Sequence, residues 1–158
     1  MKKIEGFLWL AFTKSGRGFF FGADKHNLSG FESFCTNDLT PFPTREKALT
    51  ACSALEERKD FVRSELVEIK MEMAETDEEC YKLDGKKNLV VLMKGDGGTF
   101  LVGRLVSEKR HLYPLPGALL VDNGFKPFVD FEDAFDAAGQ INRQGAPATL
   151  ATFKLKRL

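Results

Sequence analysis

Apolar residues near the start of the chain form two short, uninterrupted runs, residues 7–12 and 19–21, around a glycine-containing loop. This pattern predicts a β-hairpin. A second pair of runs, residues 89–93 and 100–102, surrounds the glycine-rich loop 94–98. Because the runs are continuous rather than alternating, we expect both faces of these strands to be covered. Helices would cover one face, and a second sheet or a partner the other.

Two later segments, residues 44–60 and 130–142, have the apolar periodicity of amphipathic helices. Thr44 and Asp130 are suited to cap them, because their side-chain oxygens can accept a hydrogen bond from a free backbone N–H group. Gly139 costs about 1 kcal/mol relative to alanine, so we expect the second helix to weaken there. The predicted buried stripes are Ala48, Leu49, Ala51, Cys52 and Leu55, and Phe131, Ala134, Phe135, Ala138 and Ile141.

A strand is predicted after each helix. Residues 65–73 alternate apolar and charged side chains, which is typical of a strand with one buried face, and residues 148–156 form the last strand. Residues 31–35 and 118–121 are short apolar stretches that predict a further strand before each helix. Each half of the chain therefore has the predicted order β-β-β-α-β.

The helix-then-strand unit occurs twice, and each copy opens with a Pro-Phe pair, Pro41-Phe42 and Pro127-Phe128. The hairpins can be superposed without a gap by matching Trp9 with Val90. A single module has one helix and cannot cover both faces of its apolar strands, so two copies would have to pack together. We predict an α+β fold of two tandem antiparallel ββ(β)αβ modules that form one compact pseudo-twofold unit.

The segment between the halves differs in composition. Residues 74–79 are acidic, and residues 83–87 are turn-like and basic. We interpret residues 74–87 as an acidic connector, part of which can form a helical turn, between a first module, residues 1–73, and a second module, residues 88–158. The carboxylates of residues 75–79 are expected to be solvated.

Charge and cysteine content limit the function classes. Lysine plus arginine and aspartate plus glutamate number 23 each, so the formal net charge is zero, which argues against a strong non-specific nucleic-acid binder. The three cysteines are widely spaced, without a disulfide or zinc pattern. A signal peptide is not expected. The apolar stretch 4–12 is short and interrupted by Glu5 and Gly6, and no signal-peptide cleavage site follows it. We expect a cytoplasmic protein with no membrane partner, and no cofactor or metal.

Catalytic and phosphate-binding motifs are weak. Both glycine loops join strand to strand, whereas a phosphate loop precedes a helix, so turn geometry explains their glycines. The two histidines, His26 and His111, lie in polar loops, and a Cys–His pair between Cys35 and His26 has no fixed geometry. An enzyme or small-ligand binder with a site between the halves remains an alternative.

Basic residues concentrate on the hairpins and on the loops that follow them. If the pseudo-twofold arrangement brings these residues onto one surface, they form a basic patch suited to nucleic acid. The alternative is that they are ordinary solvated residues, since basic residues occur at many hairpin tips. The candidate nucleic-acid-binding residues are Lys14, Arg17, Lys25, Lys94, Arg104, Lys109 and Arg110.

The loop 107–116 is longer than its counterpart in the first half, and it carries Leu112, Tyr113 and Leu115. These three residues are a candidate protein-binding site, or they cover an open sheet edge. The 15 phenylalanines, against 2 tyrosines and 1 tryptophan, fit either an aromatic core or an interface.

The leading hypothesis is a non-enzymatic protein-interaction module. Many accessory regulators and inhibitors, including those that phages and mobile elements encode, are small, neutral proteins without a catalytic motif. We therefore expect another protein as the partner, with a nucleic-acid-binding module as the alternative, and a homodimer is compatible with the sequence.

Overall fold

A computed structural model describes residues 1–14, 18–24, 39–59, 61–95, 98–105 and 125–158, and the account below concerns these residues. The structure is mixed helix and strand. The helices are α1 (Arg45–Thr50), α2 (Cys52–Glu56), α3 (Asp77–Tyr81) and α4 (Phe131–Arg143). The strands are β1 (Lys2–Thr13), β2 (Gly18–Phe21), β3 (Phe61–Met73), β4 (Leu89–Gly95), β5 (Gly98–Val102), β6 (Arg104–Leu105), β7 (Phe125–Lys126) and β8 (Ala148–Arg157).

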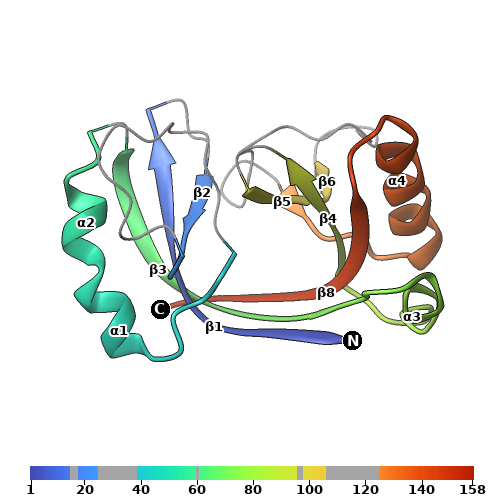
Figure 1. Cartoon of the computed structure of the whole chain (residues 1–158), viewed down its shortest axis with the longest axis horizontal. Helices are drawn as coiled ribbons and strands as arrows, with labels where there is room; N and C mark the ends of the chain where they lie inside the picture. The colour runs from blue at the N-terminus through green and yellow to red at the C-terminus, as the bar shows by residue number, and fades with distance from the viewer. Residues whose placement is uncertain (15–17, 25–38, 60, 96–97, 106–124) are drawn as a thin grey trace.

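Six strands form one antiparallel sheet in the order β2-β1-β3-β8-β4-β5, and β6 and β7 form a separate pair. Both predicted hairpins are confirmed, with Leu10 opposite Phe20 in the first and Met93 opposite Phe100 in the second. The centre of the sheet is the pairing of β3 with β8, which places Met71 opposite Phe153. The sheet is curled, so that its two hairpin ends rise toward each other (Figure 1).

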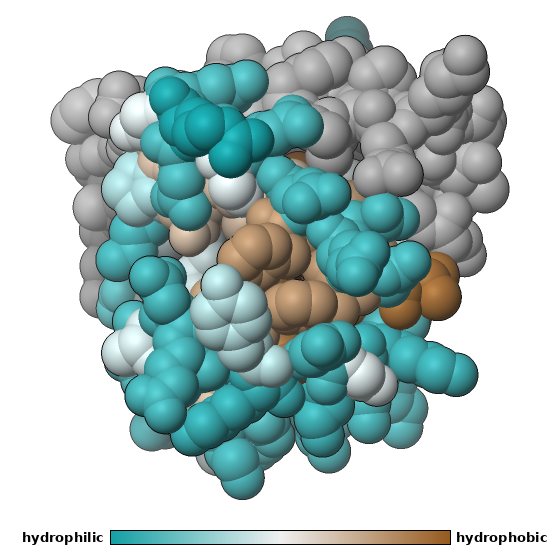
Figure 2. Space-filling model, turned by 90° about the vertical axis from the view of Figure 1, so that its right-hand side faces the viewer, coloured by the Kyte–Doolittle hydropathy of each residue, from teal (hydrophilic) through white to brown (hydrophobic). Residues whose placement is uncertain are grey.

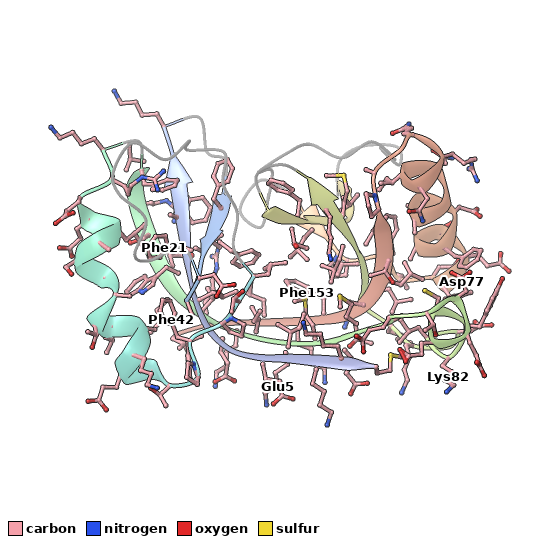
Figure 3. The ribbon with its side chains drawn as sticks, viewed as in Figure 1. Glu5, Phe21, Phe42, Asp77, Lys82 and Phe153 are labelled. Atoms are coloured by element: carbon pink, nitrogen blue, oxygen red, sulfur yellow. The ribbon has the colours of Figure 1, made fainter. Side chains whose placement is uncertain are left out.

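The inner face of the curled sheet is one hydrophobic core. Residues of β1 and β3 contribute to this inner cluster together with residues of β4 and β8, and Phe153 lies between the two arms of the sheet (Figure 3). Its buried members are Leu8, Leu10, Phe12, Phe20, Leu39, Val67, Ile69, Met71, Val90, Leu92, Leu101, Ala151 and Phe153.

Helices cover the outer face at both ends. Helices α1 and α2 lie against β1 at one end, and α4 lies against β4 and β8 at the other (Figure 1). In β1, Leu8 and Leu10 belong to the inner cluster, whereas Trp9 and Ala11 pack under α1 and α2. The prediction that both faces of the apolar runs are covered is therefore confirmed, but the inner face is covered by the opposite arm of the same curled sheet rather than by a second sheet or a partner.

The chain before α1 crosses β1 at a glycine. Phe7 and Phe42 exchange backbone hydrogen bonds of 3.0 and 2.8 Å. Gly6 has a φ of +143°, and a Cβ at this position would lie 2.5 Å from the carbonyl oxygen of Phe42. The crossing therefore requires glycine, both for its backbone conformation and for space. A similar bridge joins Leu89 to Phe128 in the second half.

The helix caps are confirmed, but the buried stripes are wrong at two positions. Thr44 accepts from the Lys47 N–H and Asp130 from the Glu132 N–H. The first helix breaks at Ala51 into α1 and α2, and Leu49 is 51% exposed. Phe135 is 37% exposed because the buried face of α4 instead includes Ala137.

Helix α4 continues through Gly139 to Arg143, so the expected weakening does not end it. Matching Trp9 with Val90 is wrong, because Trp9 faces the helices whereas Val90 faces the inner cluster. Val91 has the helix-facing orientation instead, packing against residues of α4. The strands predicted at residues 31–35 and 118–121 lie outside the described residues.

The connector contains a helix, α3, in agreement with the expected helical turn, and three of its residues are buried. Ala74, Cys80 and Leu83 are buried in the cluster beneath α4. The acidic residues 77–79 form the first turn of α3, because carboxylates are favourable at a helix N-terminus. Cys80 and Leu83, three and six residues after Asp77, face the core. The module boundaries stay a prediction: the first module ends at residue 73 and the second begins at residue 88.

Candidate functional site

Most candidate residues from the sequence cannot be placed. Leu112, Tyr113 and Leu115 lie outside the described residues, as do Arg17, Lys25, Lys109, Arg110, His26, His111 and Cys35. Lys14 and Lys94 are exposed at the ends of β1 and β4, and Arg104 pairs with Lys126 between β6 and β7. The basic patch and the loop contact site both stay predictions.

One groove opens beside the inner cluster. It has a volume of about 630 Å³ and lies between the start of β1 and the end of β3 on one side and the β4–β5 hairpin and the start of β8 on the other. Ile4, Met73 and Leu92 extend the apolar inner face of the sheet into it. Small-molecule sites commonly have volumes of about 300–1,000 Å³, so this groove could hold a compact, mainly apolar ligand.

The polar side chains of the groove are partly engaged with the protein. The Thr149 hydroxyl donates to the Ala74 carbonyl over 2.7 Å, and the Thr40 hydroxyl donates to the Asp24 carboxylate over 2.8 Å. Lys2 and Lys94 also line the groove. With two carboxylates, Asp24 and Glu75, the described lining carries balanced charges and selects neither anion nor cation.

A second surface feature joins α3 and α4. The rings of Tyr81 and Phe135 are 5.4 Å apart, and Phe135 is also 5.4 Å from Phe131. Tyr81 is 59% exposed and Phe135 37% exposed, whereas Phe131 is partly buried. We call Tyr81, Phe131 and Phe135 the aromatic patch. Figure 2 shows apolar surface at the centre of this side of the molecule, surrounded by hydrophilic residues.

The two helices that carry the aromatic patch are fixed at their starts. On α3, the Thr76 hydroxyl accepts from the Glu79 N–H, and the Glu79 carboxylate accepts from the Glu75 N–H over 3.0 Å. Each helix also has buried side chains: Cys80 on α3, and Ala134 and Ala138 on α4. The aromatic patch therefore rests on packed helices, which favours a preformed contact surface.

Sequence reasoning did not find this surface. The signal for α3 was the spacing Thr76-x-x-Glu79, a capping-box pattern inside the acidic stretch. It starts a helix that directs Cys80 and Leu83 inward and leaves Tyr81 outside. Phe135 was assigned to a buried stripe, and its partner Tyr81 is distant in sequence, so no local pattern indicated the pair.

The electrostatics of α3 are local. The amino-terminal ammonium group contacts the Glu79 carboxylate at 2.6 Å. This ammonium group and the Glu75 N–H stabilise the charged carboxylate and lower the pKa of Glu79. On α2, burial raises the pKa of the Cys52 thiol, and its hydrogen bond to Glu56 adds to the rise. Cys52 therefore stays protonated at neutral pH and is a poor nucleophile.

Comparison of the chain with protein-family models, with curated proteins and with solved structures found no match. Within the described ranges, no helix has the length and apolar character needed to cross a bilayer. The same residues contain no group of three or more histidine, cysteine, aspartate or glutamate side chains placed to hold a metal ion.

Proposed function

We propose that this chain is a non-enzymatic protein-interaction module, a small cytoplasmic regulator or inhibitor of the kind that phages and mobile elements encode, and that its aromatic patch contacts the partner. The exposure of Tyr81 beside Phe135 carries the proposal. Aromatic residues are enriched at the centres of interfaces, where they bury a large area at a small cost in side-chain entropy.

The test is capture of a partner by the tagged protein from host lysate, with and without nuclease. The wild type is compared with a Tyr81→Ser, Phe135→Ser double variant and with Leu49→Ser. Leu49 is the matched control, because it is a 51% exposed apolar residue on α1, at the other end of the molecule. We expect the wild type and Leu49→Ser to retain one protein in stoichiometric amount after nuclease treatment, and the double variant to lose it.

Two other results would change the assignment. A partner that binds the double variant as well as the wild type would exclude the aromatic patch as the contact site. Recovery of nucleic acid alone would favour the nucleic-acid-binding alternative.

We further infer that the fold is a duplicated module with pseudo-twofold symmetry. In the strand order β2-β1-β3-β8-β4-β5, each half contributes a hairpin and the strand that follows its helix, in mirrored order. The paired bridges Phe7–Phe42 and Leu89–Phe128 support the same correspondence. Duplication would explain why one inner cluster is built from both halves.

The groove supports a second candidate function, the binding of a small, mainly apolar ligand between the halves. Its volume of about 630 Å³ is the specific observation. A ligand screen by thermal shift would test it, with Met73→Trp, at a half-buried residue of the lining, as the variant that fills the groove. A ligand that stabilises the wild type but not Met73→Trp would support the site, and equal stabilisation of both would exclude it.

A further inference from the structure

Exposed carboxylates border the aromatic patch on both helices. Two lie three and four residues before Tyr81 on α3, which places them about one turn away on its side of the helix. On α4, one lies three residues before Phe135 and one directly follows it. We call these four residues the acidic rim: Asp77, Glu78, Glu132 and Asp136.

The acidic rim has no counterion in direct contact among the described residues. None of its four carboxylates forms an ion pair with another side chain in the described part of the chain. The basic residues of these helices are Lys82, at the C-terminal end of α3, and Arg143, in the last turn of α4. The Arg143 guanidinium group reaches back to Gly139, 3.3 Å from where a Cβ would lie there. Figure 3 places Asp77 on the side of α3 nearer α4 and Lys82 on the opposite side.

Helix stability explains only part of this arrangement. Carboxylates in a first turn interact favourably with the helix dipole, which accounts for Asp77, Glu78 and Glu132. It does not account for Asp136, which lies in the second turn of α4, or for the exposed rings beside the carboxylates. Apolar surface bordered by more carboxylates than basic groups is the arrangement expected of a site that selects its partner by charge.

We propose that the aromatic patch and the acidic rim together bind a basic amphipathic segment of a partner protein. Apolar side chains of that segment cover Tyr81 and Phe135, and its arginine or lysine side chains meet the carboxylates. A guanidinium group can also stack on the exposed tyrosine ring. Nucleic acid and anionic membrane surfaces are disfavoured as occupants, because their phosphates would be repelled by the acidic rim. This inference rests on the proposed function and adds the chemistry of the partner.

The test is selection from a displayed library of random 16-residue peptides on the immobilised full-length protein. Selected peptides are then measured against three variants. The first removes the aromatic patch (Tyr81→Ser, Phe135→Ser), and the second neutralises the acidic rim (Asp77→Asn, Glu78→Gln, Glu132→Gln, Asp136→Asn). The third is the matched control, Glu46→Gln with Glu57→Gln, which neutralises exposed carboxylates at the other end of the molecule.

We expect the selected peptides to combine apolar residues with an excess of arginine and lysine. Their affinity should fall tenfold or more on the rim variant, and should weaken with rising salt on the wild type, because screening reduces the attraction between charges. The control variant should bind as the wild type does. Since three rim substitutions lie at helix starts, circular dichroism checks the fold, and Asp136→Asn alone serves as the second variant, with a loss of about threefold.

The outcomes separate this inference from the proposed function. Peptides that require Tyr81 and Phe135 but bind the rim variant with unchanged affinity overturn the inference and leave the contact site in place. Peptides without excess basic residues do the same. Absence of any peptide that depends on the aromatic patch contradicts both.

Discussion

Replacing Gly6 with alanine tests whether the crossing of the chain over β1 holds the first half together. A Cβ at Gly6 would lie 2.5 Å from the Phe42 carbonyl oxygen and 2.9 Å from the Pro41 Cβ, distances that force the backbone to move. Gly6 also has a φ of +143°, and such a backbone conformation costs a residue with a side chain about 1–3 kcal/mol.

The steric contact adds to this strain. Moving the Phe42 carbonyl group disturbs the two hydrogen bonds between Phe7 and Phe42, each contributing about 0.5–1.5 kcal/mol. We therefore expect Gly6→Ala to lower the free energy of unfolding by about 2–6 kcal/mol. Gly85→Ala is the matched control: its φ is +88°, but no atom lies within 4 Å of the added Cβ, so only the strain of about 1–3 kcal/mol applies.

The assay is urea denaturation followed by circular dichroism, with linear extrapolation to water. We expect Gly6→Ala to cost at least about 1 kcal/mol more than Gly85→Ala, because only the first variant disturbs backbone hydrogen bonds. Equal losses for the two variants would refute the claim that the crossing requires glycine for space.

Three further outcomes follow from individual contacts. Trp9→Phe should cost about 1–2 kcal/mol in urea denaturation, because the buried indole N–H donates to the Ala48 carbonyl over 2.7 Å; a neutral effect would contradict this role. Leu55→Ala should cost about 2–5 kcal/mol and Leu49→Ala less than about 1 kcal/mol, since Leu55 is 3% and Leu49 51% exposed. The pKa of Glu79 is lowered from 4.5, so its contribution to stability is present above that pH and is lost as pH falls through the lowered value. The stability difference between wild type and Glu79→Gln, measured from pH 7 to pH 3, should therefore shrink toward low pH; a constant difference would contradict the assignment.

Local patterns predicted the elements that depend on local chemistry. Both hairpins follow from apolar runs around glycine loops, and both caps follow from the hydrogen-bonding capacity of Thr44 and Asp130. The uninterrupted apolar run at residues 7–12 of β1 also predicted its coverage on two faces. These features require only the properties of neighbouring residues, which the sequence displays directly.

Features that depend on distant pairing were not predicted. The pairing of β3 with β8 joins residues from 78 (Met73 and Ala151) to 90 (Val67 and Arg157) positions apart. It forms the floor of the inner cluster, and Met73 at its end lines the groove. A helical stripe does not define how wide the buried face will be, so Leu49 and Phe135 were assigned to the core although they are exposed. The aromatic patch was missed because it needs α3 and α4 to lie side by side, and no local pattern shows that packing.

Because the two halves share the inner cluster, we expect neither half to fold stably as a separate chain. Without residues 74–158, the chain 1–73 would expose the edge of β3 that pairs with β8 from Val67 to Met73. It would also expose the inner face of β1, with Leu8 and Leu10, which packs in the same cluster as Val90 and Phe153. Unpaired edges and exposed apolar faces favour aggregation over a stable monomer. We expect residues 1–73 alone to show no cooperative unfolding transition.

Mixing fragments then tests where the second unit begins. Ala74, Cys80 and Leu83 pack in the cluster beneath α4, so residues 74–158 should restore a folded complex with residues 1–73 at a 1:1 ratio. Residues 88–158, which lack these three side chains, should restore it less well, and circular dichroism melting of the mixtures measures both. Equal recovery with the two fragments would mean that residues 74–87 contribute nothing to the fold. A cooperative transition of residues 1–73 alone would mean that the inner cluster is not a core that the halves must share.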